Sequence, residues 1–264
     1  MIQTTDENEA LSVEEFYDAL AADYDTMTGF EKRFVQEKPF FRLLVERYSI
    51  RTALDAGSGT GFHSLLLAQQ GVGVTAVDLS GDMLEGVKSH AERMNLHITT
   101  VRSNFQDLEK VLKSTFDAVF CMGNSLAHLL AEEDLRTTLR NFSSLVKPQG
   151  ILFIQNLNYD RILVQRERIQ SVKEAGNKTF VRFYDFGENR LSFNILTIER
   201  GKEGVRQSMR SVQLRLLLSN ELVRLLLEYG FSEISLYGGI SMDQFDAASS
   251  KDLVVLAKKQ NQDR

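Results

Sequence analysis

Residues 53–61 read Ala-Leu-Asp-Ala-Gly-Ser-Gly-Thr-Gly, an apolar run that leads directly into alternating glycines. The apolar run predicts a short buried strand over residues 52–55, and the apolar spacing of residues 62–70 predicts a helix after the turn. Glycine lets the backbone turn tightly and lets a ligand approach it closely. The free N–H groups at the start of the helix favour a polar or anionic group. This stretch therefore predicts a ligand-binding turn between a strand and a helix.

Strands and helices alternate on the C-terminal side of this turn. Further strands are predicted over residues 72–78, 98–103, 116–122, 150–155, 231–237 and 252–258. Helical patterns separate most of these strands, and Ser80 is placed to cap a helix over residues 81–95. Such alternation is typical of an α/β fold in which a mostly parallel, seven-stranded Rossmann-like sheet is covered by helices on both faces.

Two segments depart from the alternation. Residues 11–48 have a helical pattern with a break at Gly29, so residues 1–50 are predicted to form a helical cap over the cofactor site of a domain spanning residues 51–264. Residues 178–218 contain three strand-like runs separated by glycine-containing turns. We expect these runs to form an antiparallel β insert after the fifth strand, and its exposed edge could pair with a second copy of the chain in a homodimer.

The composition of the 264-residue chain narrows the classes of function. The net charge of -5 and the lack of a long basic run argue against a nucleic-acid partner. The single cysteine, Cys121, excludes an internal disulfide, and no Cys/His cluster has the spacing of a metal site. No apolar stretch approaches the ~20 residues of a membrane helix, and the polar N-terminus does not read as a secretory signal. We expect a cytoplasmic protein that acts on a small molecule, without a metal or membrane contact.

Asp78 ends the second predicted strand, 17 residues after Gly61. On a sheet of this kind, a carboxylate at that place accepts hydrogen bonds from the ribose hydroxyls of a nucleotide cofactor. The dinucleotide fingerprint G-x-G-x-x-G, read from Gly57, requires glycine at position 62, where the chain has Phe62. A nicotinamide-dependent oxidoreductase is therefore the weaker alternative.

The pattern D-x-G-x-G-x-G that starts at Asp55 resembles motif I of class I S-adenosylmethionine (SAM)-dependent methyltransferases, and residues 78–84 resemble their second motif. The resemblance implies SAM as the cofactor, with Asp78 on the ribose and with Leu79 and Met83 on either side of the adenine. The cofactor-binding residues that it implies are Arg33, Asp55, Gly57, Ser58, Gly59, Asp78, Leu79, Met83, Asn104, Phe105 and Met122.

A narrower resemblance spans about residues 17–163. Residues 116–129, which include Gly-Asn-Ser-Leu-Ala-His-Leu, and residues 158–163, Asn-Tyr-Asp-Arg-Ile-Leu, are similar to segments of glycine and sarcosine N-methyltransferases. In that family an arginine at the place of Arg33 holds the SAM carboxylate, and an asparagine–aromatic pair like that of residues 104–105 lies beside the adenine. The resemblance implies an enzyme that transfers a methyl group to a small-molecule acceptor, an amine nitrogen, by in-line displacement.

Three residues are candidates for the catalytic site of such an enzyme. Methyl transfer from a sulfonium needs a well-positioned neutral nucleophile more than a strong base. We expect Asn124 to orient the acceptor through its side-chain carbonyl, and His128 to act as a base or an orienting group. Tyr24 beside a methyl cation donor is electrostatically favourable. The alternatives are that His128 is tied to a backbone carbonyl and that Tyr24 is only a core aromatic.

One position departs from the pattern of glycine N-methyltransferases. Those enzymes have an arginine just before the Asn-Tyr-Asp segment, and it pairs with the carboxylate of the amino-acid substrate. This chain has Leu157 there, and leucine cannot form a bidentate pair with a carboxylate. Arg161, Arg182 or Arg190 could take the place of that arginine.

Two other functions fit the same motifs. A sugar-nucleotide amine methyltransferase also has an antiparallel insert, and would need basic residues such as Arg182, Arg190, Arg210 and Arg215 near the phosphates. A SAM-binding module without turnover would keep the cofactor motifs alone. The sequence leaves open the identity of the acceptor and whether a nitrogen, oxygen or carbon atom is methylated.

Overall fold

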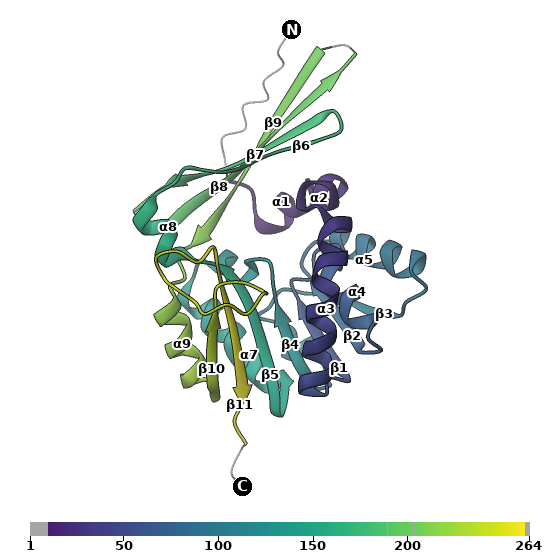
Figure 1. Ribbon diagram of the computed structural model, residues 1–264, viewed down its shortest axis with the longest axis vertical. Helices are drawn as coiled ribbons and strands as arrows, with labels where there is room; N and C mark the ends of the chain where they lie inside the picture. Colours follow the sequence, from purple (N-terminus) through teal and green to yellow (C-terminus); the bar gives the residue numbers. More distant parts are fainter. Residues whose placement is uncertain (1–9, 189, 203, 262–264) are drawn as a thin grey trace.

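The computed structural model describes residues 10–188, 190–202 and 204–261 (Figure 1). The strands of the larger of its two sheets are β1 (Thr52–Ala56), β2 (Gly73–Asp78), β3 (Ile98–Arg102), β4 (Phe116–Cys121), β5 (Val146–Leu157), β10 (Phe231–Tyr237) and β11 (Asp252–Lys259). Their order is β10-β11-β5-β4-β1-β2-β3. β1 to β5 pair in parallel, and β11 pairs antiparallel with both β5 and β10. The predicted α/β fold with a mostly parallel seven-stranded sheet is confirmed.

Helices cover both faces of this sheet. They are α3 (Phe30–Tyr48), α4 (Phe62–Ala68), α5 (Gly81–Arg93), α6 (Leu108–Val111), α7 (Glu132–Leu145) and α9 (Ser219–Glu228). Successive side chains of a strand point to opposite faces. In β4, Val119 and Cys121 therefore pack in one cluster with α7 and α9, whereas Ala118 and Phe120 pack in another with α3 and α4. The two apolar clusters fix which face of the sheet each helix covers.

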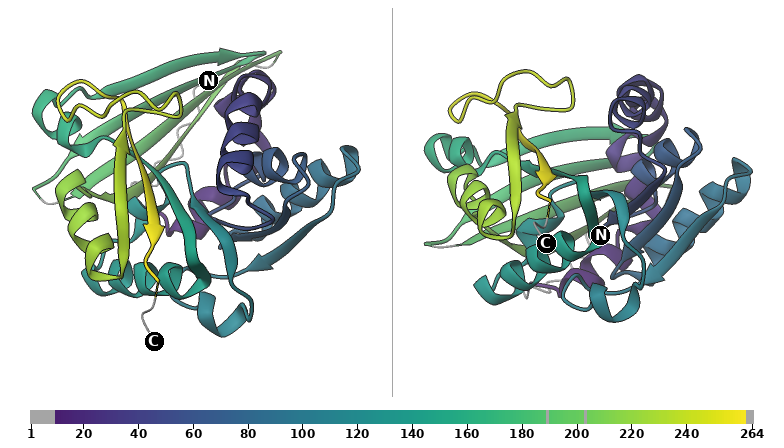
Figure 2. Two further views of the ribbon diagram at one scale, coloured as in Figure 1. Left: turned by 60° about the horizontal axis from the view of Figure 1, so that its bottom comes forward. Right: turned by 90° about the horizontal axis from the view of Figure 1, so that it is seen from below.

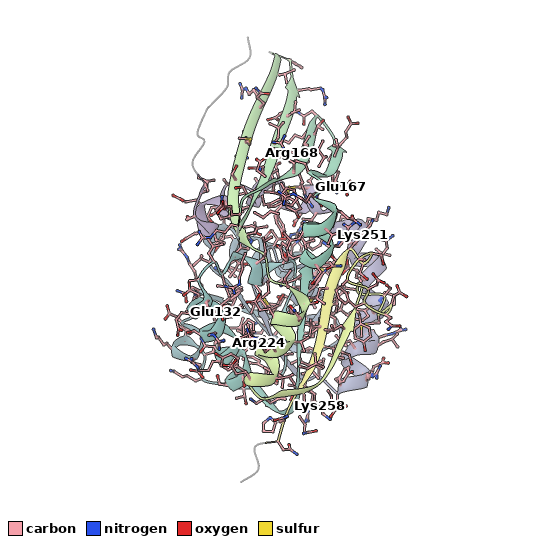
Figure 3. All side chains as sticks on the ribbon, turned by 90° about the vertical axis from the view of Figure 1, so that its left-hand side faces the viewer. Glu132, Glu167, Arg168, Arg224, Lys251 and Lys258 are labelled. Atoms are coloured by element: carbon pink, nitrogen blue, oxygen red, sulfur yellow. The ribbon has the colours of Figure 1, made fainter. Side chains whose placement is uncertain are left out.

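Charged side chains join α7 and α9 on their outer side. Arg136 donates to Glu132 of its own helix at 2.8 Å and to Glu228 of α9 at 2.6 Å. Figure 3 shows Glu132 and Arg224 on this outer side of the molecule. At the start of α5, Ser80 caps the helix as predicted, because its hydroxyl accepts the N–H of Met83 at 3.1 Å. No helix in the described part of the chain is long and apolar enough to cross a membrane.

A second, antiparallel sheet follows α8 (Tyr159–Gln165). Its strands are β6 (Ile169–Ala175), β7 (Lys178–Phe186), β8 (Arg190–Gly201) and β9 (Gly204–Arg215), in the order β6-β7-β8-β9. The predicted insert of three strands over residues 178–218 is therefore too short, because β6 precedes it. The apolar residues of β6 recur every third position, at Ile169, Val172 and Ala175, so they lack the alternation that marks a strand. β6 is recognised as a strand by its pairing with β7 and not by its sequence pattern.

The N-terminal helices lie between the two sheets. Figures 1 and 2 show the small sheet across one end of the large sheet, with α1 (Val13–Asp18) and α2 (Ala21–Thr28) beneath it. Phe16, Leu20 and Met27 pack with side chains of the inner face of the small sheet, among them Phe180 and Ile195. These contacts hold α1 and α2 above the ends of the parallel strands.

Asp117 ties the start of β4 to the start of β1. Its carboxylate accepts the backbone N–H groups of Arg51 and Thr52 at 3.0 and 2.8 Å, the Thr52 hydroxyl at 3.0 Å and the Lys147 ammonium at 2.8 Å. Burial raises the pKa of Asp117, but hydrogen bonds from Lys147, Thr52 and Arg51 outweigh it and bring the pKa to about 2. The ionised carboxylate is therefore the form that the fold stabilises.

Replacing Asp117 with asparagine should lower the free energy of unfolding at pH 7 by about 1–3 kcal/mol, because the donors lose a charged acceptor. Since the folded pKa lies below the ordinary value of 3.8, this contribution is present above pH 3.8 and is lost as the pH falls toward 2. In urea titrations, the difference between the wild type and D117N should shrink below about pH 4. Equal stability of the two proteins at pH 7 would contradict this role.

Candidate active site

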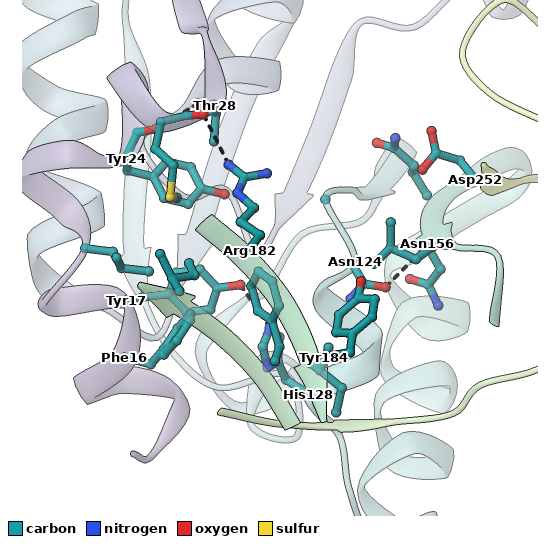
Figure 4. Close-up of a pocket in the computed structure, with 18 residues that line it drawn as sticks. Phe16, Tyr17, Tyr24, Thr28, Asn124, His128, Asn156, Arg182, Tyr184 and Asp252 are labelled. Atoms are coloured by element: carbon teal, nitrogen blue, oxygen red, sulfur yellow. Dashed lines mark hydrogen bonds between the residues drawn. The ribbon is translucent and has the colours of Figure 1, made fainter. Parts of the chain in front are cut away.

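Two adjoining cavities lie at the carboxyl ends of the parallel strands. β1 has β2 on one side and β4 on the other, so the chain order reverses beside β1, and open α/β sheets bind ligands at such a switch point. The larger cavity encloses about 550 Å³ and the smaller about 190 Å³. The smaller cavity lies between α1, α2 and the inner face of the small sheet (Figure 4).

The larger cavity brings together most of the predicted cofactor-binding residues from separate elements. The predicted residues that line it are Arg33, Gly57, Ser58, Gly59, Asp78, Leu79, Asn104, Phe105 and Met122. They come from α3, from the turn after β1, and from the segments that follow β2, β3 and β4. These residues are far apart in the sequence. They meet here because the parallel strands all end at the same edge of the sheet.

The glycine turn forms one wall of the larger cavity. The N–H groups of Gly57 and Ser58 both donate to the carbonyl of Val77, at 2.8 and 3.0 Å, which bends the chain sharply at the end of β1. Gly57 has a φ of +77°, and a Cβ atom there would lie 2.6 Å from the Ser125 hydroxyl oxygen. The Ser58 hydroxyl is buried and has no partner among the described residues. At this turn a ligand can therefore come close to the backbone, and the Ser58 hydroxyl can bind it.

Asp78 lies next to this turn. Its carboxylate accepts the N–H of Gly59 at 2.8 Å and the N–H of Ser80 at 3.0 Å. Burial raises the pKa of Asp78, and these backbone hydrogen bonds act in the opposite direction. A carboxylate has about four acceptor sites, so these backbone hydrogen bonds leave room for a ligand donor in the cavity.

Asp55 and Met83 lie outside the cavity lining. Asp55 is fully buried in β1 and accepts the Ser64 hydroxyl at 2.6 Å, which joins β1 to α4. Burial raises its pKa to about 6. Met83 is also fully buried, on the inner side of α5. Their contact with the cofactor stays a prediction.

The two cavities share one boundary. Tyr17, Tyr24, Thr28, Gly123 and His128 line both cavities. A ligand in the larger cavity and a second ligand in the smaller one would therefore meet here.

The groups at the shared boundary are uncharged. The Tyr17 hydroxyl lies 2.9 Å from Nε2 of His128, and Nδ1 of His128 has no partner among the described residues. Burial lowers the pKa of His128 to about 4 and raises the pKa values of Tyr17 and Tyr24. At neutral pH the imidazole is therefore unprotonated, and both phenols keep their protons.

Asn124 joins the ends of β4 and β5 beside this boundary. Its Oδ1 accepts the N–H of Leu157 at 3.0 Å, and its Nδ2 lies 2.9 Å from the Tyr159 hydroxyl. The side-chain carbonyl expected to orient an acceptor is thus already engaged, although Asn124 lines the smaller cavity. The sequence did not point to Thr28, Asn156 or Asp252 as lining residues, because only the fold brings these separate segments to one cavity.

Comparison with known proteins identifies the class. Residues 53–150 match the family described as methyltransferase domain. The chain is 32% identical over 229 residues to the glycine/sarcosine N-methyltransferase of Aphanothece halophytica, a match that covers 85% of this chain and 82% of that protein.

Solved structures show the same fold. A SAM-dependent methyltransferase from Clostridium acetobutylicum matches with a TM-score of 0.79 at 16% identity, over 93% of this chain and 99% of that one. The sugar N-methyltransferase KedS8 from Streptoalloteichus matches with a TM-score of 0.69 at 20% identity, over 98% of each chain.

The parallel sheet, the glycine turn after β1 and the carboxylate after β2 define a SAM-dependent methyltransferase. The predicted enzyme class and the predicted cofactor, SAM, are therefore confirmed. The chain belongs to the glycine/sarcosine N-methyltransferase family.

The imidazole of His128 should titrate with a midpoint near 4 and stay neutral down to about pH 5, because burial disfavours its cation. NMR of the ring protons, assigned by comparison with the H128Q variant, measures this midpoint. In the Y17F variant the midpoint should remain well below 6.5, since burial and not the tyrosine hydroxyl depresses it. A midpoint of 6 or above in the wild type would contradict a neutral boundary.

Proposed function

We propose that this enzyme transfers the methyl group of SAM to the amine nitrogen of a small-molecule acceptor by in-line displacement. The observation that carries the proposal is the pair of cavities that meet at an uncharged boundary. The larger cavity would hold the cofactor, and the smaller would hold the acceptor. The related enzyme of Aphanothece halophytica is named for methylating nitrogen in glycine and sarcosine, which supports an amine acceptor here.

The residues of the larger cavity fit SAM. Asp78 keeps free acceptor sites for the ribose hydroxyls, and the turn at Gly57 and Gly59 leaves room for the rest of the cofactor. Arg33 stacks over the Phe62 ring at 4.3 Å and donates to Glu37 at 2.8 Å, which would aim its guanidinium at the cofactor carboxylate. When bound, SAM supplies an electrophilic methyl group, whose carbon–sulfur bond breaks as the bond to nitrogen forms and S-adenosylhomocysteine is left.

The chain's own residues would orient the acceptor and exclude water. An ammonium group has no lone pair, so only the neutral amine reacts, and an uncharged boundary favours that form. With a pKa of about 4, His128 is a weak base, so we assign it an orienting role through its free Nδ1. Atoms of the Tyr24 ring and hydroxyl lie 3.6–4.0 Å from where a Cβ atom of Gly59 would stand, so Tyr24 would lie near the bound cation. Asn124 would hold the β4 and β5 ends in place.

The size of the smaller cavity favours a small acceptor. Its volume of about 190 Å³ lies below the ~300–1,000 Å³ of sites for drug-sized ligands. A sugar nucleotide needs more space than this cavity offers. The likeness to the sugar N-methyltransferase KedS8 is one of fold.

Residues 10–50 of the predicted cap would act as a cover over both cavities, and residues 1–9 of that cap lie outside the described residues. In α2, Asp25 accepts the Thr60 hydroxyl at 2.6 Å and lies 2.6 Å from Nε2 of His90, while Asp23 binds Lys178 of β7 at 2.7 Å. These contacts join α2 to the glycine turn after β1, to α5 and to the small sheet. Residues 51–264 would then form the domain that binds the cofactor and carries the small sheet.

We also propose a homodimer through the small sheet. β6 pairs with β7 alone among the described strands, and its Ile169 and Val172 are 57% and 61% exposed. An open strand edge with apolar side chains favours pairing with another chain. Light scattering tests this, and a monomer at all concentrations would refute it. The single cysteine, Cys121, which cannot form an internal disulfide, fits the predicted cytoplasmic location.

Asp78→Ala should weaken the binding of S-adenosylhomocysteine by about 1–3 kcal/mol, because hydrogen bonds to a charged group are lost. Isothermal titration calorimetry measures this change. Asp82→Ala is the matched control, since Asp82 lies exposed on α5 outside the cavity lining and its loss should leave the affinity unchanged. Equal affinity of D78A and the wild type would remove Asp78 from the ribose site.

An assay of S-adenosylhomocysteine release tests the activity itself. The panel of amines would include glycine, sarcosine and dimethylglycine. We expect release with at least one small primary or secondary amine. The D78A variant should show a reduced kcat/KM for SAM. If the wild type binds SAM but releases nothing with any amine, the amine-acceptor proposal fails.

A further inference from the structure

Arg182 occupies a position where the strand pattern calls for an apolar residue. Alternate residues of a strand share a face, and its neighbours on that face of β7, Phe180 and Tyr184, are both buried. Its partner on β8, Ile195, is also buried. A cation at the centre of this apolar face is costly to bury unless polar or charged partners surround it.

The guanidinium of Arg182 lacks a countercharge. Among the described residues it forms no ion pair, and the one hydrogen bond found for it is to the Met27 carbonyl, at 3.2 Å. Arg182 lines the smaller cavity, and Figure 4 shows its guanidinium directed past Tyr24 toward Thr28. Arginine has five N–H donors in a planar fork, so several remain for a ligand. Asp252 lines the same cavity but lies apart from Arg182 in Figure 4.

The position where glycine N-methyltransferases carry their substrate arginine faces the same cavity. Leu157, at the end of β5, is one of its lining residues. The other arginines considered for this role do not line it: Arg161 donates to Gln165 at 2.8 Å, and Arg190 is exposed at the start of β8. A carboxylate in the smaller cavity can therefore meet Arg182 but neither of these arginines.

We propose that Arg182 binds the carboxylate of the acceptor, so that the acceptor is a small amino acid with its amine at the shared boundary and its carboxylate on the antiparallel sheet. This inference rests on the proposed amine acceptor and names its chemical class. A bidentate arginine–carboxylate pair fixes both the position and the direction of the ligand.

The ratio of kcat/KM values for an amino acid and its amide tests this inference. Glycine and glycinamide, and sarcosine and its amide, differ only in whether the second group is a carboxylate. The wild type should prefer the acids, and R182L should lower kcat/KM for the acids by about 100-fold or more. The same variant should change the values for the amides far less. R190L, on the neighbouring strand, is the matched control and should keep the wild-type preference.

A second measurement separates this inference from the proposed activity. Acetate should bind to the wild-type complex with S-adenosylhomocysteine and should bind at least 10-fold more weakly to R182L, as followed by calorimetry. R182L should also keep its affinity for S-adenosylhomocysteine and unfold at the same temperature as the wild type or higher, because leucine suits its apolar neighbours. Loss of acetate binding supports Arg182 even if no amine on the panel reacts. Equal acetate binding by both proteins, or an unchanged preference for acids in R182L, overturns the inference.

Discussion

The reversal of chain order beside β1 is the constraint on which the rest of the structure depends. β2 lies on one side of β1 and β4 on the other, and the helices that follow β1 and β4 cover opposite faces. A crevice therefore opens where these strands end. The double hydrogen bond from Gly57 and Ser58 to Val77 forms one wall of it. The N-terminal helices and the small sheet then cover the crevice, which is divided into two adjoining cavities.

At one residue of the small sheet, Arg182, the requirements of packing and of the proposed function conflict. The inner face of the small sheet holds α1 and α2 through apolar contacts of Phe16, Phe180 and Ile195, beside the ion pair of Asp23 with Lys178. Arg182 interrupts the same face with a charge that has no described counterion. Burial lowers the pKa of its guanidinium. Buried charged groups with perturbed pKa values cluster at functional sites, which agrees with the ligand role proposed for Arg182.

The sequence predicts the parts of the fold that have strong local patterns. The glycine turn, the parallel strands and the Ser80 cap follow from apolar runs, glycine positions and capping chemistry. β6 was missed because its edge position needs no alternating apolar face. The hydrogen bond from the Leu157 N–H to the Asn124 side-chain carbonyl, 33 residues away, has no local signal in the sequence, and the orienting role of Asn124 stays a prediction. Pairings such as Tyr17 with His128, 111 residues apart, depend on the packing of the cover and have no local signal.

The most direct test of the account follows the methyl group itself. The enzyme would be incubated with SAM that carries a trideuterated methyl group and with a mixture of small amino acids and their amides, and the products would be analysed by tandem mass spectrometry. The account predicts a trideuteromethyl group on the amine nitrogen of an amino acid, with little label on the amides. Label on oxygen or carbon, or no labelled product from an enzyme that binds S-adenosylhomocysteine, would contradict it.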